Sequence, residues 1–434
     1  MSQTICGFFK KYFLEGQEID EKHVINKNDP DANYSWVERH RKVVALAIPF
    51  VIVQGIWWTL MISQDWFHFY NEPVGDYGKP RFWIAVTMIF GSIVAGATAE
   101  GGGAVAFPVM TLALGIEPKV ARDFTFMIQS VGMTSAAFTI LFMRVKIDFN
   151  ALKIISFSGV FGTIFGLEII APELTPAYSK MYFVCIWCSF AVGLYILNRN
   201  HERHVYDRIS HMEDGQVWYF NDYIGFNWKR FALLVTGFIG GMCTAISGSG
   251  IDICAFSVLT LLFRVDEKVA TPTSVVIMGA NTVVGFAYRE LIQGGVEQEG
   301  WYSLACAAPT VVVGAPMGSF MGSHFHRLTL AGILYILSGL KMIGALVVVK
   351  PWSTQNTETP FHLCVSSITI FISGMIFFQI LSKIGLKMVK DIDKLSTSTK
   401  ADSCDHDLKE AGLSGSILPN RSDADFHKYD SDLK

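Results

Sequence analysis

The hydrophobic residues of this chain gather in long runs that are separated by short polar stretches. Most of the runs approach the ~20 residues that a helix needs to cross a lipid bilayer. They cover residues 43–62, 82–98, 104–115, 120–143, 151–171, 181–197, 230–246, 251–263, 268–290, 301–323, 329–349 and 361–382. The pattern predicts an all-α polytopic membrane protein.

Two regions depart from this pattern, because a glycine-rich break divides a run of 17 residues from one of 12 or 13. The first break has the sequence Ala-Glu-Gly-Gly-Gly at 99–103, and the second has Ser-Gly-Ser-Gly at 247–250. Glycine runs hold a helix poorly and free backbone N–H groups that lipid cannot satisfy. Each region is therefore predicted to form a broken, re-entrant helical hairpin that enters and leaves the membrane on one side.

The two broken regions are copies of one another. A shift of 149 residues places Gly101 on Gly250 and gives nine identities in 21 positions, where about two are expected by chance. The same order of hydrophobic segments follows each break. The chain is thus interpreted as two repeats, 82–197 and 230–349, with one extra flanking helix at each end, 43–62 and 361–382.

Lysine and arginine indicate the orientation, because cytoplasmic loops of membrane proteins carry an excess of them. With re-entrant hairpins, one side carries 26 of these residues and the other carries five. The basic side, predicted to be cytoplasmic, holds an N-terminal tail at 1–42, a linker at 198–229 and a C-terminal tail at 383–434. The N-terminal tail is polar, unlike a signal peptide. The C-terminal tail, rich in Ser, Asp and Lys, is predicted to be disordered.

This topology fixes how the repeats are related. Each repeat contains one hairpin and three spans, which is an odd number of crossings. The second repeat is therefore predicted to be inserted upside down relative to the first. Inverted repeats with broken helices near the middle of the membrane are the architecture of many secondary transporters.

The short second helix of each hairpin begins at its break, where its first N–H groups have no partner within the helix. Two such helix ends that approach from opposite faces form a donor-rich pocket suited to a small oxyanion. The alternative is that the glycines only allow close helix packing. The candidate binding residues are Gly101, Gly102, Gly103 and Ala104 in the first hairpin and Ser249, Gly250 and Ile251 in the second.

The sequence around the breaks also resembles a known family. The stretch GGGAVAFPVMTLALGIEPKVA (101–121), its weaker copy GSGIDICAFSVLTLLFRVDEKVA (248–270) and ATPTSVVIMGANTVVG (270–285) are similar to the TauE/SafE family of sulfite and organosulfonate permeases. The resemblance covers roughly 85–350. It implies a duplicated helical bundle that moves small sulfur-containing anions. The second motif departs from the glycine-rich pattern of the family at Ile251-Asp252, which leaves the particular substrate open.

Three charged residues lie within or beside the hydrophobic segments. Glu100 in the first break is a candidate proton carrier, and the alternative is a carboxylate that caps the next helix. Asp252 is a second coupling candidate, although a carboxylate in the first turn of a helix is favourable without any such role. Lys341 lies in the middle of a span, where it could attract the anion or form an internal salt bridge.

Uncharged polar residues on the helices after each hairpin complete the candidate site. Thr125 and Ser274 occupy matching positions under the 149-residue shift, and Gln129 and Asn281 lie one or two turns deeper. Hydroxyl and amide groups can donate to sulfonate oxygens. Hydrogen bonds between packed helices are the alternative role. Arginines near segment ends, such as Arg122 and Arg289, are interpreted by default as snorkelling to the interface.

The amino-acid composition argues against several classes of function. The chain is 51% hydrophobic and only 17% charged, with a net charge of −3, where soluble domains are roughly 25% charged. A near-neutral balance implies no nucleic-acid partner, and a lone CxxC pair, Cys185 and Cys188, implies no metal or cofactor. No histidine lies deep in a span to activate a serine, which disfavours an intramembrane protease or another enzyme.

The hypothesis from sequence is therefore a transporter of small inorganic or organosulfur anions, coupled to protons or another ion. An anion channel on the same fold is the alternative, because a pore can be built from the same hairpins. The lipid bilayer is the only other partner expected. The plasma membrane is the default location with both termini cytoplasmic, and the oligomeric state is left open.

Overall fold

The computed structural model describes residues 35–98, 100–199, 218–220, 224–226, 228–353 and 360–410. The chain divides into two compact units, residues 1–386 and 387–434. The first unit holds the helical bundle, and the site lies within it.

The first repeat is a series of helices in which a half-length helix is followed by three long ones. Its elements are α4 (Phe82–Ala97), α5 (Gly103–Pro108), the π-helix η3 (Val109–Ala113), α6 (Pro118–Met143), α7 (Phe149–Phe165) with η4 (Gly166–Ile170) and η5 (Ala171–Glu173), and α8 (Pro176–Arg199). The second repeat has the same order. Its elements are α9 (Trp228–Ser247), α10 (Ile251–Ser257), the π-helix η7 (Val258–Leu262), α11 (Glu267–Leu291), α12 (Gln298–Gly322) and α13 (Arg327–Val349).

The remaining elements flank or connect the repeats. They are α2 (Trp36–Arg39), α3 (Arg41–Ser63), η2 (Trp66–Tyr70), β1 (Pro73–Val74), β2 (Lys79–Pro80), β3 (Trp218–Phe220), β4 (Ile224–Phe226) and α14 (Pro360–Glu410). The strands form two antiparallel hairpins, in which Val74 pairs with Lys79 and Tyr219 with Gly225. Apart from these short strands, the described residues form helices, as the sequence predicts.

The internal similarity extends to an unusual backbone feature. Both half-length helices end in a five-residue π-helix, and a shift of 149 residues carries η3 onto η7 without any offset. Such wide turns are rare and occur frequently at functional sites. The structure therefore repeats the same local irregularity at the same place in each half.

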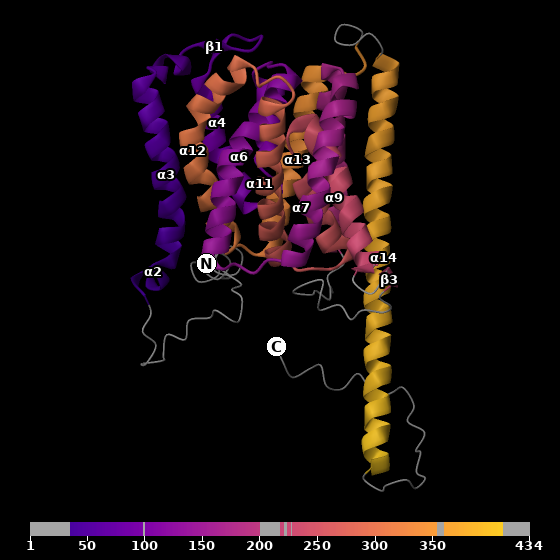
Figure 1. Cartoon of the computed structure of the whole chain (residues 1–434). Helices are drawn as coiled ribbons and strands as arrows, with labels where there is room; N and C mark the ends of the chain where they lie inside the picture. Colours follow the sequence, from indigo (N-terminus) through magenta and orange to yellow (C-terminus); the bar gives the residue numbers. More distant parts are fainter. Residues whose placement is uncertain are drawn as a thin grey trace, which may run out of the picture. The chain divides into compact units, whose positions relative to one another are not determined.

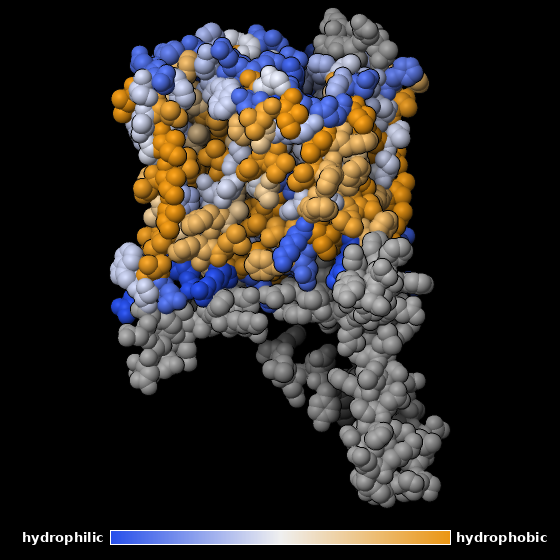
Figure 2. Space-filling view, viewed as in Figure 1, coloured by the Kyte–Doolittle hydropathy of each residue, from blue (hydrophilic) through white to orange (hydrophobic). Residues whose placement is uncertain are grey.

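The bundle has the dimensions and surface of a membrane domain. Within the described residues, nine helices are long and apolar enough to cross a bilayer, and α4, α5 with η3, and α10 with η7 are shorter. Figure 2 shows a hydrophobic belt across the middle of this face, with hydrophilic residues gathered above and below it. The protein is an integral, multi-pass membrane protein.

The two repeats pack through reciprocal contacts (Figure 1). Helix α4 of the first repeat packs against α12 of the second, and α9 of the second repeat packs against α7 of the first. Helices α6 and α11, which follow the half-length helices, pack against each other and are largely buried. The long helix that follows each half-length helix is therefore held in the interior of the bundle.

The N-terminal flanking helix α3 is attached to α12 at a proline. Pro309 has no N–H to bond the carbonyl four residues earlier, which belongs to Ala305. The indole nitrogen of Trp57 donates to that carbonyl at 2.6 Å, and Gln54 Nε2 donates to the carbonyl of Pro309 at 2.8 Å. The helix outside the repeats thus satisfies a backbone group that lipid could not.

A buried arginine secures the connection between α3 and α4. The Arg81 side chain, 2% exposed, donates to Glu72 at 2.8 Å and to both carboxylate oxygens of Glu299 at 3.0 Å. Burial alone lowers the pKa of Arg81, but the bonds to Glu72 and Glu299 outweigh it and the pKa is raised. The guanidinium therefore stays charged and ties the connection to α12.

Substitution of Arg81 by glutamine is expected to destabilise the protein by about 1.5–3 kcal/mol, because hydrogen bonds to two charged groups are lost. Thermal unfolding of the detergent-purified protein measures the change. Lys119→Gln serves as the control, because its ion pair with Glu297 at 2.9 Å is about half exposed on both sides and contributes under about 1 kcal/mol. Equal effects of the two substitutions would contradict this account.

The C-terminal end of the chain differs from the sequence prediction. The tail was expected to be disordered from residue 383, but α14 continues as a helix to Glu410. The prediction relied on hydrophobic periodicity, which a solvated helix does not need to show. No proline or glycine interrupts 386–410, so nothing in the backbone stops the helix. Most of the N-terminal tail and of the linker at 198–229, and all of 411–434, lie outside the described residues.

Candidate functional site

The two glycine-rich breaks are in direct contact, although they lie about 150 residues apart in the chain. Ser249 Oγ in the second break lies 3.4 Å from the backbone carbonyl oxygen of Glu100 in the first and 3.1 Å from Asp252 Oδ2, so its single proton is donated to one of these two acceptors at a time. Gln129 on α6 donates from Nε2 to the carbonyl of Gly248 at 2.6 Å. The side chains of Ser249, Glu100 and Gln129 are buried, at 0–1% exposure. The breaks therefore form one cluster inside the bundle.

Glycine is required at three positions in this cluster. Gly101 and Gly248 have φ of +67° and +78°, a region that other residues enter only at a cost. A Cβ on Gly101 would collide with the carboxylate of Asp252. At Gly103 it would contact Ser249 and lie 2.6 Å from Thr125 Cγ2 and 2.8 Å from Gln129 Nε2. Close approach of the two breaks thus depends on missing side chains.

The backbone donors differ between the two breaks. In the second, the N–H of Ile251 donates to Thr244 Oγ1 at 2.9 Å, and the N–H of Ile253 donates to Asp252 Oδ1 at 3.0 Å. In the first, the N–H groups of Gly101, Gly102 and Ala104 have no hydrogen-bond acceptor among the described residues. The N–H groups of Ser249 and Gly250 in the second break likewise have no acceptor among the described residues, so both breaks hold open donors.

A buried ion pair lies beside the first break. Lys341 Nζ on α13 is 3.0 Å from Glu100 Oε2, and the Ser338 hydroxyl donates to Glu100 Oε1 at 3.1 Å. Glu100 is fully buried and Lys341 is 7% exposed. The Glu100 carboxylate thus bonds side chains of α13, and no hydrogen bond from the first turn of α5 to it is recorded among the described residues. The positive charge of Lys341 is therefore balanced by the negative charge of Glu100.

Asp252 occupies the corresponding place in the second break. Its Oδ2 accepts from the Ser249 hydroxyl at 3.1 Å, and its Oδ1 accepts the N–H of Ile253 in the first turn of α10. The carboxylate also lies against Gly101 of the other break. It therefore caps its own helix and faces the open donors at the same time.

The structure brings most, but not all, of the uncharged candidates together. Thr125 is fully buried, with its methyl group against both breaks, although its hydroxyl donates to its own helix at Ala121. Gln129 Oε1 is buried with no partner among the described residues. Asn281 lies next to Gly159 of α7, and its Oδ1 also has no partner there. The Ser274 hydroxyl donates to Thr271 within its own helix.

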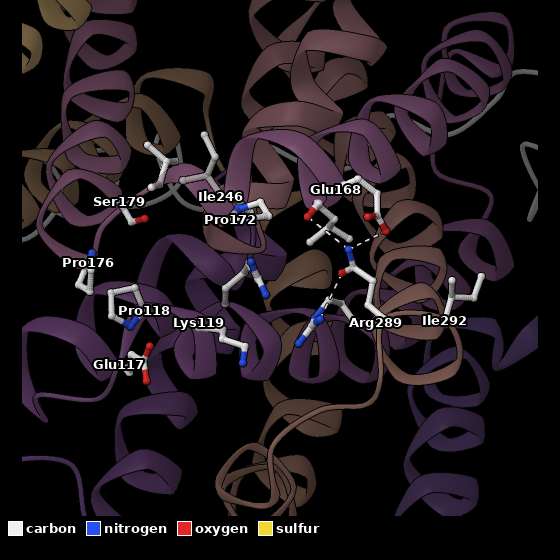
Figure 3. Close-up of a pocket in the computed structure, with 15 residues that line it drawn as sticks. Glu117, Pro118, Lys119, Glu168, Pro172, Pro176, Ser179, Ile246, Arg289 and Ile292 are labelled. Carbon is white, nitrogen blue, oxygen red and sulfur yellow. Dashed lines mark hydrogen bonds between the residues drawn. The ribbon is translucent and has the colours of Figure 1, made fainter.

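A cavity of ≈690 Å³ lies within the bundle (Figure 3). One of its lining residues is Ile246 of α9, which directly precedes the second break. Its other lining residues come from the first turn of α6, from η4 and η5, from the start of α8 and from the end of α11. Its charged lining residues are Glu117, Lys119, Arg122, Glu168 and Arg289.

Two arginines of this cavity share one buried carboxylate. Arg122 donates to Asp123 Oδ1 from Nε and Nη2 at 3.0 and 2.9 Å. Arg289 donates to Oδ1 from Nε at 2.9 Å and to Oδ2 from Nη2 at 2.6 Å. The side chains of Arg122, Arg289 and Asp123 are 9%, 7% and 1% exposed. The two arginines do not snorkel to the interface; they converge beneath the cavity.

Several residues of the site were not identified from the sequence. Ser338 precedes Lys341 by three residues, so helical spacing could have placed it on the same face. Thr244 has no matching polar residue in the first repeat, since the shift pairs it with Ala95. The pairing of Arg289 with Asp123 spans 166 residues and has no signal in a single sequence. No cluster of three or more metal-ligating side chains occurs among the described residues.

Comparison with known proteins gives one match. A sequence model of the family described as sulfite exporter TauE/SafE matches residues 82–345. The match therefore covers both repeats, from the start of α4 to within α13. No curated protein and no solved structure matches the chain.

Proposed function

Because the chain belongs to the sulfite exporter TauE/SafE family, and is thus a membrane transporter of that family, we propose that it moves small sulfur-containing oxyanions by alternating access in exchange or symport with protons. The observation that supports the proposal is the contact between the two breaks, together with a cavity whose lining includes Ile246, the residue that precedes the second break. A carrier exposes its site to one side at a time, whereas a channel needs a continuous path.

The repeats are proposed to be inverted. Figure 1 draws β1, which precedes α4, at the upper end of the bundle and β3, which precedes α9, at the lower end. This placement supports an arrangement in which the two repeats begin at opposite ends. We place the lower end, with α2, in the cytoplasm, on the charge asymmetry of the loops, and take the plasma membrane as the location.

The anion is proposed to bind at the first break. The N–H groups of Gly101, Gly102 and Ala104 supply donors at the start of a half-length helix, where the helix dipole favours negative charge. Gln129 and Ser249 border the same space. Organosulfur and inorganic oxyanions share the feature that is recognised, a group of oxygens that accept several hydrogen bonds.

Protons are proposed to load through Glu100 and Asp252. A proton on Glu100 breaks its ion pair, so that the charge of Lys341 becomes available to the anion. A proton on Asp252 removes the negative charge that faces Gly101. Each event favours anion binding, and the bound anion in turn favours each proton. Reciprocal coupling of this kind is a thermodynamic requirement once the two ligands interact.

Uptake of labelled sulfite, sulfate, thiosulfate and taurine into proteoliposomes tests the proposal. We expect saturable flux of at least one anion, which increases when a pH gradient is imposed in the favourable direction. Empty liposomes and protein-containing liposomes without a gradient are the controls. Ohmic single-channel currents without saturation would favour the channel, and no flux of any of the four would reject the substrate class.

A further inference from the structure

The cavity brings two guanidinium groups to one buried carboxylate. Arg122 and Arg289 both bind Asp123. All three side chains are less than a tenth exposed. Because a buried polar group without a hydrogen-bond partner is costly, a guanidinium nitrogen left open at this cluster is stabilised by an acceptor from solution.

The open donor of the cluster belongs to Arg122. Arg289 Nη1 donates to Gln293 Oε1 at 3.2 Å, in addition to its two bonds to Asp123. Arg122 uses Nε and Nη2 for Asp123, and its Nη1 has no partner among the described residues. That nitrogen is not among the buried atoms left without a hydrogen bond, and Arg122 lines the cavity. It is therefore accessible to a ligand there.

The other charges around the cavity do not occupy this cluster's open donor. Lys119 is paired with Glu297, and Glu168 accepts from Tyr288 at 2.7 Å and from Gln293 at 2.8 Å. Glu168 also attracts Arg289 electrostatically. Figure 3 places Glu117 across the cavity from Arg289. Among the described residues, neither Glu117 nor Glu168 forms an ion pair with Arg122.

The cluster is not a by-product of the duplication. Under the 149-residue shift, Arg122 and Asp123 correspond to Thr271 and Pro272, which carry no charge. The pair of Arg122 and Asp123 therefore has no counterpart in the second repeat under this shift.

We infer that Arg122, held in place by Asp123 and Arg289, forms a separate outer binding site that captures a small oxyanion in the cavity before it reaches the breaks. A guanidinium presents parallel N–H donors that match two oxygens of such a group. Arg122 contacts the anion, whereas Asp123 and Arg289 are positioning residues. The identity of the physiological anion rests on the proposed function, whereas anion binding at Arg122 does not require that the protein transports.

The test combines binding and flux on full-length protein. Titration of detergent-purified protein with sulfate and thiosulfate, followed by calorimetry, gives the affinity, and proteoliposome uptake gives KM and maximal rate. We expect Arg122→Gln to raise the Kd and the KM by at least ~10-fold. This fold-change corresponds to the loss of about one pair of hydrogen bonds from a charged donor. Lys119→Gln, which removes a paired cation from the same cavity, should change both by less than ~2-fold.

The outcomes separate the site from the transport function. An unchanged Kd in a folded Arg122→Gln protein, or an equal loss in Lys119→Gln, would overturn the site. Binding by the wild type without flux of any tested anion would overturn transport and leave the site standing. Should Arg122→Gln not fold, Arg122→Lys keeps the charge but loses the paired donors, and an unchanged Kd there would also overturn the inference.

A phosphate headgroup of an anionic lipid has the same chemistry as a free oxyanion. Titration in nanodiscs with and without phosphatidylglycerol distinguishes the two sources. Sulfate affinity that is the same in both lipids supports a site for a soluble anion. Loss of sulfate binding only when the anionic lipid is present, with no change in sulfate KM for Arg122→Gln, would assign the site to lipid and overturn the inference as stated.

Discussion

Replacement of Gly103 by alanine is expected to lower transport by at least ~10-fold while leaving membrane insertion intact. The added Cβ would overlap Ser249, Thr125 and Gln129, which come from the second break and from α6. Overpacking of a filled interior costs roughly 1–3 kcal/mol, and it can be relieved only by moving the first half-length helix away from these neighbours. Labelled-anion uptake normalised to the amount of reconstituted protein measures the effect.

Gly339→Ala on α13 is the matched control for this substitution. Nothing lies within 4 Å of the Cβ that it would add, and alanine is the better helix former by about 1 kcal/mol. Transport by this variant should equal that of the wild type. If Gly103→Ala transports as well as Gly339→Ala, the contact between the breaks does not matter for function and the proposed site is wrong.

Substitution of Lys341 by methionine is expected to cause the largest loss of stability. Glu100 would keep a buried charge without its partner, and breaking such a pair costs about 3–5 kcal/mol. The double variant Glu100→Gln/Lys341→Met removes both charges and should recover most of this stability, because an amide and a thioether tolerate burial better than an unpaired charge. Thermal unfolding in detergent and the yield of monodisperse protein measure both effects.

Transport separates the structural role of this pair from its proposed role in coupling. The double variant should fold but show weaker stimulation by a pH gradient, because the amide that replaces the Glu100 carboxylate cannot accept a proton and only Asp252 remains. Lys119→Met, at an exposed ion pair, controls for the loss of a lysine and should change stability by under about 1 kcal/mol. A double variant that keeps the full proton stimulation of the wild type would remove Glu100 from the coupling mechanism.

The helices of the bundle were predicted well from the sequence because hydrophobic runs and glycine breaks are local signals. The first predicted break ends at Gly103 and α5 begins there, and the second ends at Gly250, one residue before α10. The length of α14 was not predicted, because its C-terminal part has no run of hydrophobic residues. The wide turns η3 and η7 were not predicted either, since a π-helix differs from an α-helix in backbone bonds and not in composition.

The site was only partly predictable, because side-chain partners depend on packing between distant segments. Glycines and the polar residues of α6 could be chosen from their places near a break. That Lys341 reaches Glu100, 241 residues away, depends on the packing of α13 beside the first break. The arginine cluster was interpreted as snorkelling from position alone, and only the structure reveals that Asp123 draws both arginines inward.

The carboxylate of Asp252 against Gly101 bears on the energetics of a transport cycle. If a proton must neutralise it before a singly charged anion can bind nearby, and if this is the only proton that moves with the anion, the loaded carrier moves no net charge. The voltage across the membrane would then contribute nothing to accumulation, and only the difference in pH would drive it. A doubly charged anion moving with the same single proton would instead carry current, so substrate valence would decide whether the protein responds to membrane potential.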